Sequence, residues 1–127
     1  MKTQSTIRIQ RPIDRVWTLL ADDFTGIQRW SKSVLKSEPL ASTRIELSDG
    51  QVQAGRVCEF TPRGKDGLYA IEAITDYDKA NYTLHFDVEL QNAPRALPVR
   101  RNHVTVRLRD SGEGSTDVVW ETEPELK

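Results

Sequence analysis

The sequence predicts a single domain of the α+β class, in which short helices are segregated from an antiparallel sheet. Two patterns predict this class. Near the N-terminus the apolar residues follow a helical period over two short stretches, and after them alternating apolar and polar residues predict about six strands. The length of 127 residues suits one domain of ordinary size, so we expect residues 1–127 to form it.

The first strand and the first helix are expected to meet at a proline. Residues 5–9 alternate apolar and polar side chains, which predicts a strand. Pro12 favours a helix start, because the N–H that it lacks has no partner in a first helical turn. One helical face then carries four apolar residues: Ile13, Val16, Trp17 and Leu20. Residues 24–30 predict a second, shorter helix.

The rest of the chain is predicted to form a meander of strands. The candidate strands lie at residues 33–38, 53–61, 68–76, 82–90, 100–109 and 116–122. The segment 82–90 has the clearest period of two, which is typical of a half-buried antiparallel strand. Glycines in residues 111–115 predict a hairpin turn between the last two strands.

Composition excludes several classes of protein. The 18 Lys and Arg residues nearly balance 19 Asp and Glu residues, whereas a nucleic-acid-binding protein usually carries a basic excess. No apolar run approaches the length of a membrane span, and residues 1–5 show no secretory signal. Because Cys58 is the only cysteine, no internal disulfide can form, and we expect a cytoplasmic protein. We expect no metal site and no cofactor, because the sequence has neither ligand spacings nor a phosphate-binding loop.

The strands are predicted to share one large apolar face. Its members are Tyr82, Leu84, Phe86, Val88, Val104, Val106, Leu108 and Trp120. Two short helices cannot cover a face of this size. We therefore expect that another segment or a partner covers the rest, or that part of the face is exposed and prone to association.

Several short motifs follow one another in a characteristic order. They are Ile9-x-x-Pro12-x-x-x-Val16-Trp17-x-x-Leu20, Phe24-x-x-Ile27-x-x-Trp30, Gly55-Arg56-Val57-Cys58-Glu59, Glu72-Ala73-Ile74-Thr75-Asp76-Tyr77-Asp78, Leu97-Pro98-Val99 and Val118-Val119-Trp120. With these motifs the whole chain resembles the START-like (SRPBCC) superfamily. This superfamily has the helix-grip fold and includes polyketide cyclase/dehydrase-like proteins, pollen-allergen-like lipid binders and abscisic-acid receptors.

The resemblance implies a curved antiparallel sheet with two short N-terminal helices, and the chain departs from it at two points. The long C-terminal helix that usually lies across the concave face is absent from this sequence. Cys58 stands where the superfamily usually has an arginine, which puts any ligand anchor dependent on that guanidinium in doubt.

Strand parity and the resemblance together predict the ligand-binding residues. If Phe86 and Val88 face inward, counting by twos places Asn102 and Arg100 on the same face, and Ile74 shares its parity with Glu72. The resemblance makes Glu72 a pocket glutamate and Leu97 a residue of a latch loop. The complete set of ligand-binding candidates is Trp30, Cys58, Glu72, Ile74, Phe86, Val88, Leu97, Arg100 and Asn102.

Each of these candidates also has a purely structural interpretation. Glu72 and Arg100 could form an ion pair at the edge of the core, because a buried carboxylate needs a partner. Trp30 could seal the junction between helix and sheet, and Cys58 could be a small buried hydrophobic residue. His85 and His103 have the parity opposite to the apolar face, which predicts exposure to solvent.

Three functions remain as hypotheses. The first is the binding of a small hydrophobic or amphipathic molecule between the curved sheet and the helices, with Glu72 orienting the ligand. The second is a polyketide cyclase/dehydratase-like enzyme that uses Glu72 as its acid or base. The third is an interaction module whose open sheet face contacts a partner or a second copy in a homodimer.

Overall fold

A computed structural model describes residues 2–29, 36–39, 45–46, 52–53, 55–60, 67–93 and 96–126 of the chain. The strands are β1 (Thr3–Ile9), β2 (Lys36–Pro39), β3 (Ile45–Glu46), β4 (Val52–Gln53), β5 (Gly55–Glu59), β6 (Tyr69–Asp78), β7 (Thr83–Gln91), β8 (Val99–Gly112) and β9 (Ser115–Leu126). Between β1 and β2 lie the α-helix α1 (Ile13–Trp17), the π-helical turn η1 (Thr18–Asp22) and the 3₁₀ helix η2 (Phe24–Arg29). A further 3₁₀ turn, η3 (Lys79–Asn81), joins β6 to β7.

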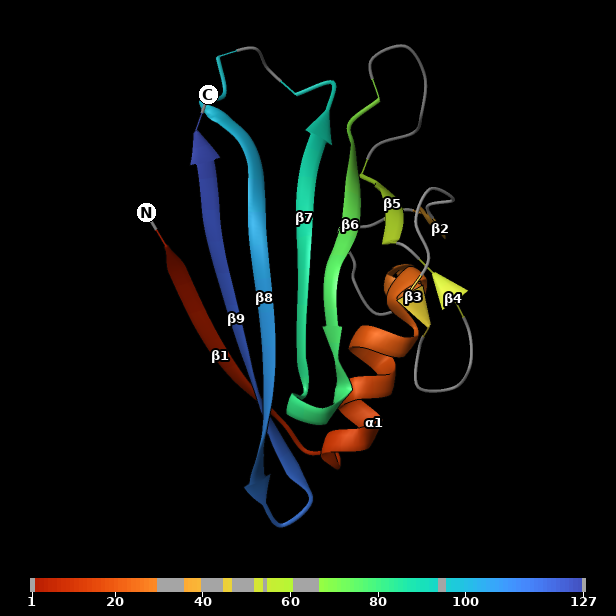
Figure 1. Cartoon of the computed structure of the whole chain (residues 1–127), viewed down its shortest axis with the longest axis vertical. Helices are drawn as coiled ribbons and strands as arrows, with labels where there is room; N and C mark the ends of the chain where they lie inside the picture. The colour runs from red at the N-terminus through yellow and green to blue at the C-terminus, as the bar shows by residue number, and fades with distance from the viewer. Residues whose placement is uncertain are drawn as a thin grey trace.

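The main sheet has seven antiparallel strands in the order β1-β9-β8-β7-β6-β5-β2, and β3 and β4 pair separately (Figure 1). The α+β, helix-grip fold class that the sequence predicted is confirmed. Consecutive strands from β5 to β9 are neighbours, as in a meander, and β1 returns to the edge beside β9. None of the helices in these described ranges is both long enough and apolar enough to cross a bilayer.

The two predicted N-terminal helices are present, but their hydrogen bonding differs from that of two ordinary α-helices. The first begins after Pro12, as the sequence predicted, and then widens into a π-helical turn that the Asp23 N–H closes by donating to the Thr18 carbonyl at 2.8 Å. The second is a 3₁₀ helix and not an α-helix. The wider turn brings Ala21 and Asp22 into buried positions. The usual C-terminal helix has no counterpart among the described residues, which end with β9.

The helices and the sheet share one core on the face of the sheet that α1 covers, which we call the inner face. The buried core residues are Val16, Trp17, Ala21, Phe24, Ile74, Leu84, Phe86, Val104, Val106, Leu108 and Val118. The ring of Phe86 lies at the centre of this cluster, with the Phe24 ring at 5.0 Å and the Trp120 ring at 5.8 Å between centroids. Period-two alternation on β7 and β8 therefore predicted the buried face correctly.

A series of side-chain hydrogen bonds links the first helix to β6. Trp17 Nε1 donates to Tyr77 Oη at 3.1 Å, and Tyr77 Oη donates to a carboxylate oxygen of Asp22 at 2.5 Å. Because the Trp17 N–H and the Tyr77 hydroxyl both have acceptors, the helix can pack its indole ring against the sheet without leaving these donors unsatisfied. This anchoring keeps α1 over one end of the inner face.

The other end of the inner face is only partly covered. Moving away from α1 along β7, burial falls from Phe86 to Val88 and then to Leu90, whose side chain is 39% exposed. Trp120 on β9 is half-buried. The helices therefore lie over one end of the sheet (Figure 1). The exposed apolar side chain of Leu90 lies toward the other end, at the end of β7.

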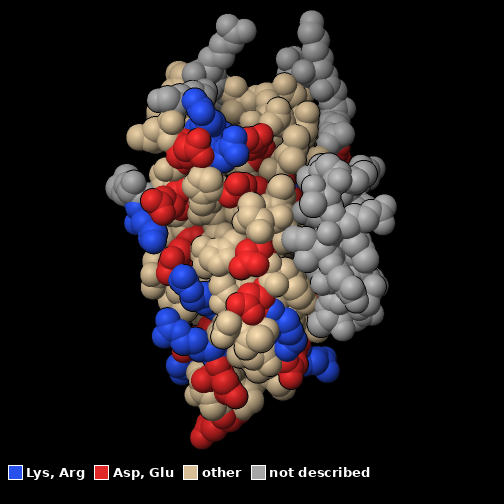
Figure 2. All heavy atoms as spheres, in the orientation of Figure 1, with Lys and Arg blue, Asp and Glu red and all other residues tan. Residues whose placement is uncertain are grey.

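The opposite face of the sheet is charged. There His103 on β8 lies between two carboxylates, with Nδ1 at 2.6 Å from Asp87 and Nε2 at 3.0 Å from Glu125. Arg101 contacts Glu89 at 3.0 Å and Glu125 at 3.6 Å. Positive and negative side chains are also interspersed on the face seen in Figure 2, without a field of one sign. His103 is exposed, as the sequence predicted, whereas His85 is half-buried beside Thr105.

These carboxylates make stability depend on pH through His103. Hydrogen bonding to Asp87, and further contact with Glu125, raise the pKa of His103 above its ordinary value. The folded state therefore binds the proton more tightly than the unfolded state, and the resulting stabilisation is present below a pH of about 6.5 and is lost as pH rises through the native pKa. We expect the urea midpoint of the protein to fall across this window, and a smaller fall in a His103→Gln variant. Equal pH profiles for the two proteins would contradict this account.

Candidate functional site

A buried ion pair joins β5 to β6 on the inner face. Arg56 is 3% exposed and Glu72 7% exposed, and they are direct cross-strand partners in the sheet. Arg56 Nη2 and Nε donate to the same carboxylate oxygen of Glu72, at 2.7 and 2.9 Å. The charges of the two side chains therefore compensate each other inside the core, as burial of a carboxylate requires.

The same guanidinium also holds the 3₁₀ helix η2. Arg56 Nη1 donates to the Phe24 carbonyl at 2.7 Å, and the guanidinium carbon lies 3.7 Å from the centroid of the Phe24 ring. A cation over an aromatic face is attracted by the ring quadrupole, and this attraction increases where water is excluded. Arg56 is thus the point at which η2, β5 and β6 meet.

Close approach of two backbones makes this arrangement possible. A β-carbon added at Gly55 would lie 2.1 Å from the Glu72 carbonyl oxygen, which is far inside contact distance. Any larger residue would push β5 away from β6 at the position next to the ion pair. Gly55 therefore has a structural role: it allows β5 and β6 to approach closely enough for the Arg56 guanidinium to reach the Glu72 carboxylate.

Cys58 lies beside the pair and is fully buried. Burial, followed by the nearby negative charge of Glu72, raises the pKa of the Cys58 thiol to about 12. A thiol with this pKa is protonated at neutral pH and is a poor nucleophile. Its packing against Ile27 and Phe60 agrees with the interpretation of Cys58 as a small buried hydrophobic residue.

The structural partner of Glu72 differs from the one considered at the sequence level. The structural interpretation of the sequence pairs Glu72 with Arg100. The partner is instead Arg56, and the Arg100 guanidinium lies 3.7 Å from Glu125 near the sheet surface. The reason is a register shift between Val99 and Arg101 in the pairing of β8 with β9, which breaks the strict alternation from Asn102 back to Arg100. Cys58 stands where the resemblance predicts an arginine. Arg56, two residues earlier on the same strand, brings a guanidinium to the inner face instead.

A second group of predicted residues gathers at the open end of the inner face. A pocket of about 130 Å³ lies between β7, β8 and the segment before β8. Its lining comprises Val88, Leu90, Leu97, Val99, Arg100, Arg101 and Asn102. Apolar side chains form most of this lining, and Asn102 and Arg100 bring polar groups to it. We call this site the open-end pocket.

The structure thus divides the nine predicted ligand residues into separate groups. Four line the open-end pocket: Val88, Leu97, Arg100 and Asn102. Glu72 and Cys58 belong to the buried polar cluster, while Ile74 and Phe86 pack in the core and present almost no surface to a ligand. Trp30 lies outside the described residues.

Sequence reasoning missed two features of the site. Leu90, Val99 and Arg101 line the pocket although none of them was a candidate. Arg56 was part of a motif, but its role was not recognised. A signal was available, because Arg56 shares strand parity with Cys58; an inward cysteine implies an inward arginine, and a buried arginine needs a carboxylate on a neighbouring strand.

The chemistry open to these groups is limited. Both donor contacts of Arg56 with Glu72 fall on one carboxylate oxygen, so a proton transfer through that oxygen would have to break the pair. Within the described ranges, no three His, Cys, Asp or Glu side chains gather closely enough to hold a metal ion. The open-end pocket, by contrast, combines apolar walls with a few polar groups, as small-molecule sites do. Its 130 Å³ is less than the roughly 300–1,000 Å³ of most such sites, so it holds only part of a ligand.

Comparison with solved structures finds the same fold in proteins of low sequence identity. A START superfamily protein from Mycobacterium smegmatis matches with a TM-score of 0.71 and 14% identity over 99% of this chain and 77% of its own. The Zhui aromatase/cyclase from Streptomyces sp. R1128 matches with a TM-score of 0.69 and 17% identity, over 100% of this chain and 68% of its own. Norcoclaurine synthase from Thalictrum flavum matches with a TM-score of 0.63 and 16% identity, over 100% of this chain and 70% of its own.

Sequence comparison places the chain in a family. No curated protein matches it. The model of one family, described as polyketide cyclase/dehydrase and lipid transport, matches residues 1–126. This match covers nearly the whole chain and agrees with the helix-grip fold of the solved structures. The chain therefore belongs to the polyketide cyclase/dehydrase and lipid transport family.

Proposed function

We propose that this protein binds a small hydrophobic or amphipathic molecule in the open-end pocket. The observation that carries the proposal is the convergence of Val88, Leu90 and Leu97 on one hollow that Asn102 also lines. Burial of apolar ligand surface drives the association, at about 25 cal/mol per Å² before entropy costs. The amide of Asn102 orients the polar part of the ligand.

The buried ion pair of Arg56 and Glu72 stabilises this site from the neighbouring strands β5 and β6. Glu72 lies directly opposite Val88 across the β6–β7 pairing, so its ion pair with Arg56 braces the strand that carries the pocket wall. In this proposal Glu72 positions the sheet and does not contact the ligand. This role differs from the ligand-orienting role that the resemblance implies, because the Arg56 guanidinium already takes up the carboxylate.

Binding is a better proposal than catalysis or self-association. A cyclase would need a general base in reach of its substrate. The one inward carboxylate that the sequence suggested, Glu72, is buried and bonded through one oxygen to Arg56. A dimer through the centre of the sheet would need Phe86 and Val106, and both are already buried by the chain itself. The presence of a single cysteine in the sequence supports our proposal that the protein is located in the reducing cytoplasm.

A neutral fluorescent probe tests the proposal. We expect N-phenyl-1-naphthylamine to bind the protein with increased fluorescence, and Leu90→Asp to weaken this binding about tenfold, because a carboxylate in an apolar pocket loses hydration. Ile7→Asp is the control. Ile7 is 60% exposed on β1 and lines neither this pocket nor any other pocket described below.

The result that contradicts the proposal is equally defined. Absence of probe binding to the wild-type protein, or equal affinities in wild type and the Leu90→Asp variant, would exclude the open-end pocket as the binding site. Urea unfolding of both variants serves as the control for folding, since both positions are exposed enough to accept a charge.

A further inference from the structure

A larger groove lies at the opposite end of the molecule, between the end of β1 and the first helical segment. Its volume is about 330 Å³, which is within the range of small-molecule sites. The lining residues are Ile9, Arg11, Arg15, Val16, Thr18, Leu19 and Asp23. We call this the helix groove. It shares no residue with the open-end pocket and is independent of the function proposed above.

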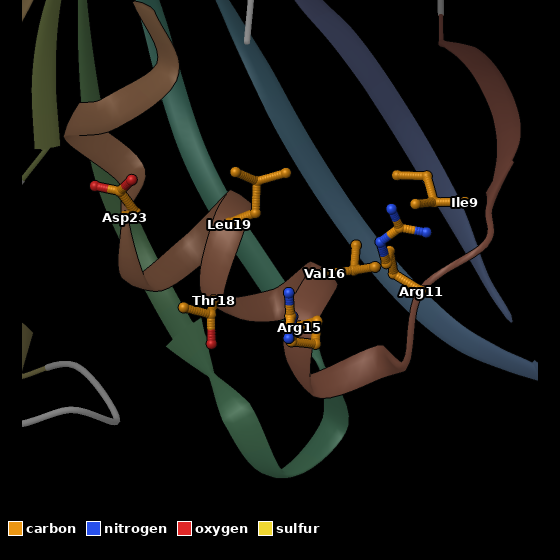
Figure 3. Close-up of a pocket in the computed structure, with 7 residues that line it drawn as sticks. All are labelled: Ile9, Arg11, Arg15, Val16, Thr18, Leu19 and Asp23. Carbon is orange, nitrogen blue, oxygen red and sulfur yellow. The ribbon is translucent and has the colours of Figure 1, made fainter. Parts of the chain in front are cut away.

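The apolar and charged parts of the groove are arranged along its length. Figure 3 shows Arg11 beside Ile9 and Val16 at one end, and Asp23 at the opposite end, with Leu19 between them. Figure 3 shows the Asp23 carboxylate pointing away from Arg11 and Arg15, and a β-carbon added at Gly26 in η2 would meet this carboxylate. The end near Arg11 therefore combines positive charge with apolar surface.

The two cations of the groove have no acidic partner among the residues that the structure describes. Arg15 makes no side-chain hydrogen bond or ion pair within this set, and the one such bond of Arg11 goes from Nη1 to the Gln10 carbonyl at 2.7 Å. Other arginines are paired: Arg8 with Asp117, Arg56 with Glu72 and Arg107 with Glu121. A guanidinium has five N–H donors, so most donors of Arg11 and Arg15 remain available to an anion.

The segment that carries Arg11 is held in place. The Arg11 N–H donates to the Ile9 carbonyl at 2.9 Å, and its own carbonyl accepts from Thr116 Oγ1 at 2.9 Å. Thr116 is completely buried on β9. These bonds fix the backbone before any ligand arrives, which reduces the conformational entropy that binding would cost.

We propose that the helix groove binds a single-chain amphiphile that ends in a carboxylate. Arg11 and Arg15 donate charge-assisted hydrogen bonds to the carboxylate, and Ile9 and Leu19 contact the alkyl chain. A guanidinium matches the planar geometry of a carboxylate better than that of a neutral head group. The 40% exposed side chain of Leu19 supplies apolar surface that a bound chain would remove from water.

Calorimetric titration with decanoate, below its micellar concentration, tests the proposal. We expect decanoate to bind wild-type protein and decyltrimethylammonium, which has the same chain and the opposite charge, to bind far more weakly. The double variant Arg11→Gln/Arg15→Gln should weaken decanoate binding about tenfold or more, because it removes hydrogen bonds to a charged group. Leu19→Asp should also weaken it. Ile7→Asp changes an exposed apolar residue that lines neither pocket, and it should leave decanoate binding unchanged.

Each other result overturns the proposal. Equal affinities for the anionic and the cationic amphiphile would show that the arginines do not select the head group. Loss of decanoate binding in Leu90→Asp but not in the double arginine variant would move the ligand to the open-end pocket. Binding to vesicles of anionic phospholipid without binding of free decanoate would indicate a membrane-contact surface. Failure here leaves the naphthylamine result unaffected, because the two tests depend on different residues.

Discussion

Replacing Arg56 with methionine is expected to lower the free energy of unfolding by about 3–5 kcal/mol, one of the two largest effects that the structure predicts. The variant keeps most of the side-chain volume but leaves the Glu72 carboxylate buried without its cation. It also removes the donor to the Phe24 carbonyl and the cation over the Phe24 ring. Urea denaturation at neutral pH, followed by circular dichroism, measures the change.

A double-mutant cycle of Arg56→Met, Glu72→Met and the double variant separates the interaction energy of the pair from the individual effects of the two side chains. In Arg56→Met/Glu72→Met neither charge of the pair remains, so this variant should recover much of the stability lost in the single variant. Arg8→Met breaks an exposed pair with Asp117 and should change stability only slightly, because solvent screens surface pairs. A loss in Arg56→Met no greater than that in Arg8→Met would contradict the role given to the buried pair.

Truncation of Phe86 is the second large effect. Phe86→Ala is expected to lower the free energy of unfolding by about 3–5 kcal/mol, because it opens a cavity in the centre of the core. The ring is 1% exposed and contacts the rings of both Phe24 and Trp120, so helix η2, β7 and β9 all lose packing. Thermal and urea unfolding measure this loss.

The matched variant is Phe86→Leu, which retains most of the apolar volume and should lose clearly less stability. A further readout follows from the position of Trp120. Loss of its edge-to-face partner should change the tryptophan fluorescence of Phe86→Ala in the folded state. Stability of Phe86→Ala within error of wild type would show that Phe86 faces a ligand cavity and not a packed core.

Much of the fold was predictable because the signals are local. The period of two along residues 82–90 needs no knowledge of the partner strand, and its inward residues Leu84 and Phe86 are buried as predicted. Counting by twos also placed Asn102 on the same face as Val104, and in the sheet these two residues lie opposite Val88 and Phe86. Pro12 marked the start of the first helix because its effect is confined to one turn.

The unpredicted parts depend on the relative register of the strands. Parity along a single strand cannot show that Arg56 lies opposite Glu72, since this follows from how β5 aligns with β6. The register shift at Arg100 likewise has no marker such as glycine in the sequence. The helix groove was not predicted because it forms between β1 and the helical segment, where the π-helical turn changes which side chains lie together.

Native mass spectrometry of the protein purified from its own host tests most directly whether the open-end pocket holds a small molecule. The account predicts that wild-type protein carries a small-molecule adduct, that Leu90→Asp purified in the same way has lost it, and that Ile7→Asp retains it. An unmodified mass for the wild-type protein, or the same adduct on Leu90→Asp, would contradict the account.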